Sequence, residues 1–518
     1  MEDQQFREAA REVIDYIIDY QRDIRDRPVL PSVSPGYLSK LVPTEAPATP
    51  DSWRDVMRDV ERVIQPGMTH WHSPQFHAFC PLANSPPALL AELLAHGLSC
   101  VGLSWEAAPA CLELEVTVMD WLARMLALPA HFLSDSGRGG GVIIGSATEG
   151  VVLTLTSEEI AAGNVPIYVL ATLGTTGTCA FDPLDELGAV CSEYGLWLHV
   201  DAAYAGPAFV CPEFRHLLRG VEHVTSFSFN AHKWMLVNFE CTALWVRDSA
   251  AFSSAHRIDA QVLATAETTL PNFRNWSLAL GRRFRALKLW FVLRLYGVSG
   301  IQAYIRGHVA LARQFEELVR QDRRFEVVSP ASMGVVCFRV RGEDNTATER
   351  LLERVTAAGR VFMVSTMVPG RRLAARFVVV SRVTSAEDVL TSWREIQRQV
   401  GPACGDSLAP EDVSLTQESV SPVQETASES PEVADQRQED MYATRQVPRG
   451  HEGLAYPIED LDQCPDEASD TPQQVADMLQ KVACLPQEVA RPPMLRTKSG
   501  RWISELVAAE RRFSRGMQ

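Results

Sequence analysis

The feature that most constrains the fold is an alternation of short β-branched runs and helical stretches between about residues 139 and 247. Runs rich in Val, Thr, Phe and Trp are typical of buried strands, and the longer stretches between them are typical of helices. Strands that alternate with helices favour an α/β fold with a mainly parallel sheet. The expected strands are VPIYVLATLG, LWLHVDAAYA, VTSFSFNA and TALWVRD, and the expected helices are DPLDELGAVCSEYG and PEFRHLLRGV.

The first 300 residues are expected to form two regions. Residues 1–85 are interpreted as a helical dimerisation segment, because apolar side chains between Phe6 and Ile18 recur at helical spacing. These apolar side chains are expected to be buried, either against the body of the protein or against a second subunit. Residues 86–300 are interpreted as the α/β domain that carries the chemistry.

The character of the chain changes twice after residue 300. Residues 301–400 predict a small α+β domain, with a long helix over 301–321, the strands FEVVSP, GVVCFRVRG, VFMVST and ARFVVVSR, and the helices TATERLLERVTAAG and SAEDVLTSWREIQRQV. Residues 401–518 contain 21 Asp and Glu against 11 Lys and Arg and are rich in Ser, Gln and Pro. Such a composition buries too little apolar surface to offset ordering entropy, so a disordered acidic tail is expected.

The charge and cysteine content exclude several classes of protein. A formal net charge of −16 disfavours non-specific binding to nucleic acid or to anionic membranes. The sequence has no run of 18 apolar residues and no secretory leader pattern at its start. Eleven cysteines without a CxxC pair indicate reduced thiols rather than a disulfide framework. We therefore expect a cytoplasmic protein with no nucleic-acid or membrane partner.

The sharpest chemical constellation is an aspartate and a lysine at the ends of two expected strands. Asp201 lies in HVDAAYAG, and Lys233 lies in SFSFNAHKWM. Because strand carboxyl ends face the ligand crevice of an α/β sheet, the two side chains are expected to share a pocket. A partly desolvated lysine can form a Schiff base, and a carboxylate suits the pyridinium nitrogen of pyridoxal 5′-phosphate (PLP). A buried Asp–Lys ion pair explains the same residues equally well.

Two further groups of residues are weaker signals. The glycine-rich run GRGGGVIIGSATEG lets the backbone approach a phosphate, and Asn230 could add a donor, but the run is neither GxGxxG nor a P-loop. His70, His72 and His77 lie close together in the sequence and raise the question of a metal site. They lack the HExxH spacing and any Cys/His pairing. Core or pocket histidines are the better interpretation, so no metal is expected.

Together these residues resemble the group II PLP-dependent decarboxylases, close to the aromatic-L-amino-acid decarboxylases, with the histidine decarboxylases nearby. The likeness covers about residues 1–400 in one continuous order. The matching phrases are PGYL, GMTHWHSP, SWEAAPACLELE, MDWLARML, GGGVIIGSATE, ATLGTTGTCAFD, WLHVDAAYAG, FVCPEFRHLL, NAHKWMLVNF, GRRFRALKLWFVLRLYGVSGIQAYIR and GVVCFRVRG.

The resemblance implies a fold-type I PLP-dependent transferase-like fold, PLP as the cofactor and a homodimer with the cofactor near the subunit interface. It implies that Lys233 holds the cofactor covalently, that Asp201 pairs with its pyridine nitrogen, and that His232 lies beside the lysine. The other implied contacts are Ala147, Thr148 and Asn230 at the phosphate, Thr176 and Ala203 against the ring, Trp71, Pro81 and Leu82 in the substrate pocket, and Val101 and Leu103 reaching that pocket from the partner subunit.

The implied reaction is decarboxylation of an aromatic L-amino acid to its amine. The substrate amine would displace Lys233, CO2 would leave, and the electrons would flow into a ring kept protonated by Asp201. A proton donor would then protonate the α-carbon.

The chain departs from the family first by a gap. The family has a long segment between the GSATE-like turn and the strand before ATLGTT, with a DQAHSS-like motif whose histidine stacks on the cofactor ring. Here Glu149 is followed by Gly150 and then by VVLTLTSEEIAAGNVPIYV. The α/β domain is therefore expected to be shortened near 150–160, with at least one strand missing from inside the sheet and unpaired strand edges left behind.

Two smaller departures concern the reaction and the substrate. Val262 stands where the family has a loop tyrosine, the expected proton donor. Leu82 and Leu103 replace residues that are usually polar or aromatic. Three interpretations follow: a decarboxylase of aromatic amino acids, a catalytically inert paralogue or truncated isoform that dimerises with a relative, and an aldehyde synthase in which the intermediate reacts with O2.

Overall fold

The structure of the chain is a computed structural model that describes residues 1–102, 104–162, 168–256, 271–279, 281–342 and 344–400. These residues belong to one compact unit, Met1–Asp412. The expected disordered tail, Leu103 and Val262 lie outside the described residues.

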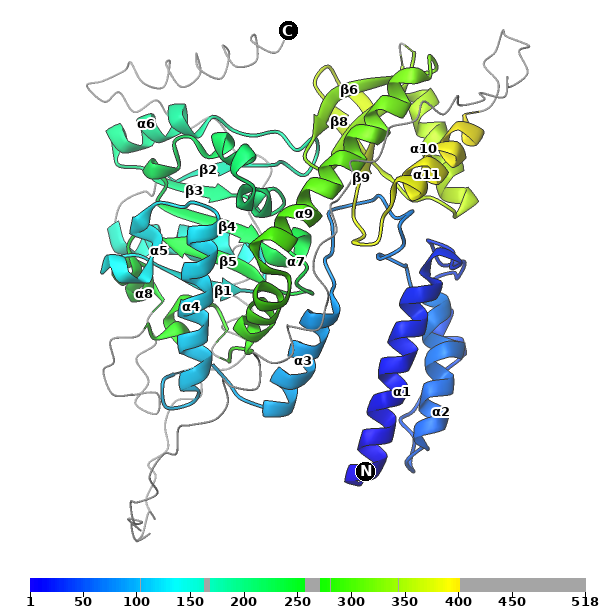
Figure 1. Cartoon of the computed structure of the whole chain (residues 1–518), viewed down its shortest axis with the longest axis horizontal. Coiled ribbons are helices and arrows are strands. Elements are labelled where there is room, and N and C mark those ends of the chain that lie inside the picture. Colours follow the sequence, from blue (N-terminus) through cyan, green and yellow to red (C-terminus); the bar gives the residue numbers. More distant parts are fainter. Residues whose placement is uncertain (103, 163–167, 257–270, 280, 343, 401–518) are drawn as a thin grey trace, which may run out of the picture. The chain divides into compact units, whose positions relative to one another are not determined.

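A five-stranded sheet forms the centre of the α/β domain (Figure 1). Its strand order is β1-β5-β4-β3-β2. The neighbours β2, β3 and β4 are parallel, whereas β5 is antiparallel to both β4 and β1. Four strands therefore run in one direction, which confirms the expected mainly parallel α/β sheet. The bounds are β1 Gly140–Ile144, β2 Tyr168–Thr172, β3 Trp197–Asp201, β4 Ser226–Asn230 and β5 Thr242–Val246.

The gap in the sequence leaves no break inside this sheet, so the expected loss from its interior was wrong, whereas the expected unpaired strand edge is present at β2. Hydrogen-bonded pairing runs without interruption from β1 to β2. The shortened stretch instead precedes β2, which is an edge strand with no described partner on its outer side. Leu170 of β2 is 47% exposed. Every strand that is present still pairs with at least one neighbour. The residues missing before β2 therefore affect the edge of the sheet and not its interior.

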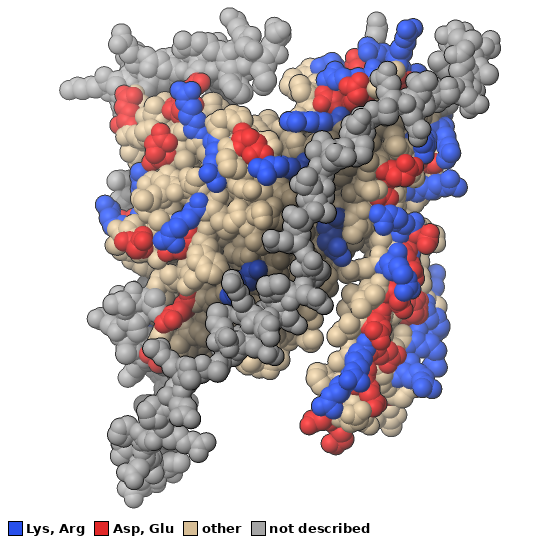
Figure 2. Space-filling view, viewed as in Figure 1, with Lys and Arg blue, Asp and Glu red and all other residues tan. Residues whose placement is uncertain are grey.

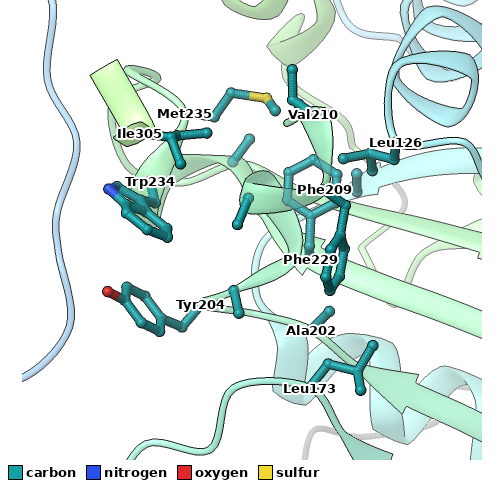
Figure 3. Close-up of a cluster of buried hydrophobic side chains, with 14 of the residues drawn as sticks. Leu126, Leu173, Ala202, Tyr204, Phe209, Val210, Phe229, Trp234, Met235 and Ile305 are labelled. Atoms are coloured by element: carbon teal, nitrogen blue, oxygen red, sulfur yellow. The ribbon is translucent and has the colours of Figure 1, made fainter. Parts of the chain in front are cut away.

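Helices cover both faces of the sheet and bury its apolar side chains. Every residue of β1, β4 and β5 is buried, as expected for strands enclosed on both faces. One core cluster joins the strands to the segments that follow them, and Figure 3 shows part of it around Phe209, Phe229 and Trp234. The covering helices are α4 Pro109–Met125, α5 Ala147–Ala162, α6 Leu184–Tyr194, α8 Ser249–Ala255 and α9 Arg285–Gln321.

One segment of this domain that was expected to be an α-helix has another conformation. Residues 212–221 were expected to be an α-helix, but Pro212–Leu218 forms tighter 3₁₀ turns. The Arg215 guanidinium donates hydrogen bonds to the carbonyl oxygens of Phe209 (3.0 Å) and Met125 (3.0 Å). Tertiary contacts thus fix a conformation that the helical pattern alone does not indicate.

A second, antiparallel sheet forms the small α+β domain, with the order β6-β7-β9-β8. The long helix expected over 301–321 begins earlier, at Arg285, and bends at Gly297, whose φ is +63°. α9 therefore contacts both α3 and β6. The last two strands are offset from their expected positions. The bounds are β6 Phe325–Ser332, β7 Val335–Val340, β8 Val364–Val368, β9 Arg372–Val378, α10 Thr346–Ala358 and α11 Ala386–Gln399.

The N-terminal region is helical, as expected. Residues 1–85 contain α1 (Asp3–Arg22) and α2 (Trp53–Asp59), and α3 (Pro86–Leu98) begins the next region. In α1 only Ala9 is buried, and the stripe side chains Phe6, Ile14 and Ile18 are exposed. Charged side chains of both signs lie along α1 in Figure 2, and on the face shown they are interspersed over the rest of the chain as well. Within the described ranges no helix is long and apolar enough to cross a bilayer.

Candidate active site

Four strands that run in one direction bring their carboxyl ends to the same edge of the sheet. β3 ends at Asp201 and β4 at Asn230, and the short helix α7 (Ala231–Trp234) follows β4 directly. The glycine-rich turn at Gly145 follows β1, and the turn with Thr176 follows β2. This edge is where ligands bind in open α/β sheets, and it gathers the chemical residues expected from the sequence.

Lys233 is held in place by its buried neighbours. Trp234 is fully buried, stacks on Tyr204 with ring centroids 5.1 Å apart, and donates its indole N–H to Nδ1 of His308 at 3.0 Å. Figure 3 shows the Trp234 and Tyr204 rings facing each other. Lys233 itself is half-buried and makes no hydrogen bond or ion pair with a described residue. Its backbone is therefore fixed while its amine stays available.

Asp201 lies at the end of the neighbouring strand and keeps part of its carboxylate without a partner. Oδ1 accepts a hydrogen bond from the Ala203 amide at 2.8 Å, whereas Oδ2 accepts none from the described residues. The Asp201–Lys233 ion pair, the alternative raised by the sequence, does not form among the described side chains. Burial raises the pKa of Tyr168, to which the nearby Asp201 charge contributes.

The start of α5 offers a site for an anion. The Ser146 hydroxyl accepts a hydrogen bond from the Glu149 amide at 3.1 Å, and the Glu149 carboxylate accepts one from the Gly145 amide at 2.8 Å. The motif Ser-x-x-Glu thus fixes the first turn of the helix. Ala147 is half-buried and Thr148 is exposed on this turn. The first-turn amides of a helix favour bound phosphate.

Asn230 provides a side-chain donor next to this turn. It is buried, and its Oδ1 accepts a hydrogen bond from the Thr242 hydroxyl at 2.9 Å. The same hydroxyl lies 3.4 Å from the carbonyl oxygen of Gly145. The Asn230 Nδ2 makes no hydrogen bond to a described residue. This amide is therefore oriented and still free to donate.

His232 is fixed beside Lys233 and stays neutral. Its Nδ1 lies 2.9 Å from both the amide nitrogen and the carbonyl oxygen of Cys241. Burial, with a smaller contribution from the charge of Lys233, lowers the pKa of His232 to about 4. The His232 carbonyl accepts a hydrogen bond from the Ala83 amide at 2.7 Å. That bond brings buried Pro81 and half-buried Leu82 to α7.

Four further residues were also expected to contact the cofactor or the substrate. Trp71 stacks on Phe76 and Phe79, with centroid separations of 4.8 and 5.3 Å. Thr176 is exposed in the turn after β2. Val101 is 46% exposed on the α3–α4 connection, and Leu103 lies outside the described residues. Their expected contacts with cofactor and substrate stay predictions.

The three histidines considered for a metal have separate environments. His70 Nδ1 contacts the Tyr20 hydroxyl at 2.8 Å, whereas His77 contacts the Val378 carbonyl at 3.0 Å and the Ser392 hydroxyl at 2.8 Å. His72 lies in the wall of a small cavity of about 40 Å³. In the part of the chain that the structure describes, no group of three or more His, Cys, Asp or Glu is arranged to hold a metal ion.

Sequence reasoning missed the residues that support the site. Thr242 orients Asn230, Cys241 orients His232, and the Thr154 hydroxyl bonds that of Tyr168 at 2.9 Å. Only the Ser146–Glu149 pair had a sequence signal, the capping spacing. The cavity of about 430 Å³ does not mark the chemistry either, because it lies at the amino end of β1, lined by Gly140, Asp120 and others.

The residues present fit PLP. A covalent attachment requires an amine, and Lys233 has one without a competing ion pair. A pyridine nitrogen requires an acid partner, and Asp201 retains a carboxylate oxygen for it. A phosphate requires donors, and the α5 turn and the Asn230 amide supply them. Among the described residues, none is assigned to the place of the family's ring-stacking histidine.

Known proteins resemble this chain over most of its length. The chain matches the pyridoxal-dependent decarboxylase conserved domain over residues 35–158 and 154–341. It is 43% identical to the aromatic-L-amino-acid decarboxylase of Drosophila melanogaster, over 76% of this chain and 91% of that protein. It is 42% identical to that of Rattus norvegicus, over 77% and 98%. The two matched pieces of the domain meet at residues 154–158, where the gap is expected.

Solved structures show the same fold. Tryptophan decarboxylase of Catharanthus roseus, in complex with L-tryptophan, superimposes with a TM-score of 0.73 at 37% identity, covering 77% of this chain and 98% of that one. The 4-hydroxyphenylacetaldehyde synthase of Rhodiola rosea superimposes with a TM-score of 0.72 at 35% identity and the same coverage. The chain therefore belongs to the pyridoxal-dependent decarboxylases, the group II family of PLP enzymes.

Proposed function

We propose that this protein is a PLP-dependent decarboxylase that converts an aromatic L-amino acid to its amine and CO2. The observation that carries the proposal is the pair of uncompensated groups, the amine of Lys233 and the carboxylate of Asp201, at one edge of the sheet. Its substrate class is supported by the relatives named aromatic-L-amino-acid decarboxylase at 42–43% identity.

The residues of this chain have distinct roles in that reaction. PLP, when bound, accepts the electron pair that CO2 leaves on the α-carbon. Lys233 would hold the cofactor through its side-chain amine. Asp201 holds the proton on the pyridine nitrogen, and the α5 turn with Asn230 binds the phosphate. His232, neutral because burial lowers its pKa, shapes the pocket beside the lysine without adding a charge.

The departures from the family lower the expected rate. A loop valine cannot protonate the α-carbon, and general acid catalysis typically contributes about 10²- to 10⁴-fold. We therefore expect decarboxylation slower than in a relative with a loop tyrosine by about that factor. A Val262→Tyr variant should raise the rate of amine formation, measured by chromatography under single-turnover conditions. An unchanged rate would show that Val262 is not at the donor position.

Two other functions are favoured by specific observations. The interrupted domain match favours an inert subunit that pairs with a longer relative. The similarity to 3,4-dihydroxyphenylacetaldehyde synthase of Drosophila melanogaster, at 42% identity, favours an aldehyde-forming enzyme. The products distinguish these functions. A decarboxylase forms an amine alone, an aldehyde synthase forms an aldehyde with ammonia and peroxide, and an inert subunit forms none of these products.

The first experiment tests the cofactor site itself. Purified protein is incubated with PLP, treated with borohydride and mapped by mass spectrometry. We expect a covalent adduct on Lys233 and a visible absorbance band that Lys233→Ala abolishes. Lys40→Ala is the matched control, because Lys40 is exposed and far along the chain from the site. Absence of a Lys233-dependent adduct would contradict both enzyme functions.

We further propose that the protein forms a homodimer. Among the described residues, α3 exposes Leu90, Leu93 and Leu98, although it is apolar on nearly every side. A helix that is hydrophobic all round is normally buried. Exposed apolar side chains on α1 and α3 are therefore expected to meet a second copy, which would also bring Val101 toward the neighbouring site.

A further inference from the structure

The connection between α3 and α4 brings two cysteines together. The Sγ atoms of Cys100 and Cys111 lie 3.1 Å apart, although the residues are separated by eleven positions in the sequence. Cys100 is half-buried, Cys111 is buried, and both are free thiols. A disulfide bond is about 2.05 Å long, so an approach of about 1 Å would bring the sulfurs to bonding distance.

Backbone contacts that do not involve sulfur hold this connection in place. The Gly102 amide donates a hydrogen bond to the carbonyl oxygen of Arg282 at 3.0 Å. Arg282 is in turn bonded to Glu115 of α4 at 2.5 Å. A methyl group placed on Gly102 would lie 3.5 Å from Cβ of Cys111, an ordinary contact distance. The main chain beside Cys100 therefore lies directly against the first turn of α4.

The environments of the two thiols differ. Burial and the hydrogen bond with Cys100 raise the pKa of the Cys111 thiol, so this sulfur stays protonated at neutral pH. The thiolate is the reactive form of cysteine. Cys100, the more exposed of the two, is therefore the sulfur that a small oxidant reaches first.

We propose that Cys100 and Cys111 are an oxidation site at which hydrogen peroxide forms a reversible intramolecular disulfide. The Cys100 sulfur gives up its proton and attacks one peroxide oxygen, the O–O bond breaks, and the departing hydroxide takes that proton, so a sulfenic acid and one water result. The Cys111 thiol then gives up its proton as its sulfur attacks the Cys100 sulfur, the S–S bond forms, the S–O bond breaks, and the departing hydroxide takes the Cys111 proton and leaves as the second water. The two sulfurs lose two electrons and the peroxide gains them. A dithiol reductant reverses the change.

This modification acts on the connection that carries Val101. A disulfide between its start and the first turn of α4 closes a short loop and restricts it. The proposal does not depend on decarboxylation, because thiol chemistry is its readout. A protein without any enzyme activity would still show the disulfide, and an active enzyme could lack it.

Peptide mapping of the full chain tests the proposal. The protein is treated with peroxide, its remaining thiols are alkylated under denaturing conditions, and it is digested without reduction by a glutamyl endopeptidase. Cleavage after Glu92, Glu106 and Glu113 places the two cysteines on separate peptides, LLAHGLSCVGLSWE and AAPACLE. We expect these peptides to be joined, to separate on addition of dithiothreitol, and to account for a loss of two titratable thiols per chain.

Variants make the assignment specific. Cys100→Ser and Cys111→Ser should each abolish the joined peptide, and Cys191→Ser should retain it. Cys191 is a suitable control because it is buried in α6 and has no sulfur contact among the described residues. Far-UV circular dichroism checks that each variant folds. If a variant does not fold, the peptide map of the wild-type protein still tests the proposal. The proposal is overturned if neither thiol reacts, if Cys100 joins another cysteine, or if Cys100 reaches the sulfinic acid while Cys111 is alkylated.

Discussion

At the residue scale, Asp201 and Lys233 are the pair proposed to hold the cofactor, and each keeps a polar group without a partner among the described residues. Sequence spacing placed Asp201 and Lys233 at strand ends but could not distinguish a cofactor site from an ion pair. The distinction depends on side-chain direction, and the structure shows no bond between them. Similarly, the sequence indicated Asn230 as a donor, whereas its orientation depends on Thr242, twelve residues further along the chain and on a different strand.

Thr242→Val should weaken PLP binding without changing the fold. The substitution keeps the shape of the side chain and removes the hydroxyl that orients Asn230. Loss of one hydrogen bond, about 1 kcal/mol, corresponds to about fivefold weaker binding. Titration of PLP by fluorescence quenching measures the change in Kd. Thr117→Val on the exposed face of α4 is the control, and equal Kd values for the two variants would disprove the role of Thr242.

At the element scale, a buried ion pair joins α4, β1 and the segment before α9. Arg282 donates hydrogen bonds to Glu115 (2.5 Å) and to the Ile143 carbonyl (2.9 Å), and Glu115 accepts one from the Ile143 amide (2.9 Å). Arg282→Met should destabilise the protein by about 3–5 kcal/mol, because it leaves the Glu115 charge buried without a partner. Urea unfolding measures the loss. Arg282→Met combined with Glu115→Leu should recover part of it, and a double variant no more stable than the single one would refute this explanation.

His77 connects the N-terminal region to β9 and α11 and predicts a pH dependence of stability. Burial lowers its pKa to about 4. Below the unfolded-state value of about 6.5, the unfolded chain binds a proton that the folded protein does not. This residue therefore lowers the free energy of unfolding by about 1.4 kcal/mol per pH unit as pH falls from 6.5 to 4. His77→Gln should show a shallower slope in urea unfolding between pH 5 and 6.5, and an identical slope would rule the residue out.

The elements that sequence patterns predicted well are those with strong local signals. β4 and the start of β3 lie close to their expected positions, because buried β-branched runs define them locally, whereas β3 ends at Asp201, four residues before the end of the expected run. The start of α11 follows from Ser385 and Asp388, which form a capping box. Pro212–Leu218 and the offset strands of the small domain could not be predicted, because neighbouring elements determine their conformation and register.

At the scale of the whole molecule, deletion of residues 1–22 should weaken self-association. This removes the exposed stripe of Phe6, Ile14 and Ile18. Sedimentation velocity on the full and shortened chains measures the change. If the chain instead acts as an inert subunit, the same deletion should abolish co-purification with a full-length relative. Retained association in both assays would show that α1 is not part of the interface.

The order of strands, and with it the place of the gap in the sheet, is a property of the whole molecule that could not be predicted from the sequence, although the sequence located the gap along the chain. Pairing between β1 and β5, far apart along the chain, depends on long-range contacts. The expected interruption inside the sheet was wrong for that reason. The domain bounds and the cytoplasmic location stay predictions.

The edge position of β2 has a consequence for how such a gene can change. Every pairing from β1 to β2 is present although this chain is shorter before β2 than its family. A longer and a shorter form of one chain can therefore share this strand order. The shorter form keeps the lysine-bearing end of the sheet.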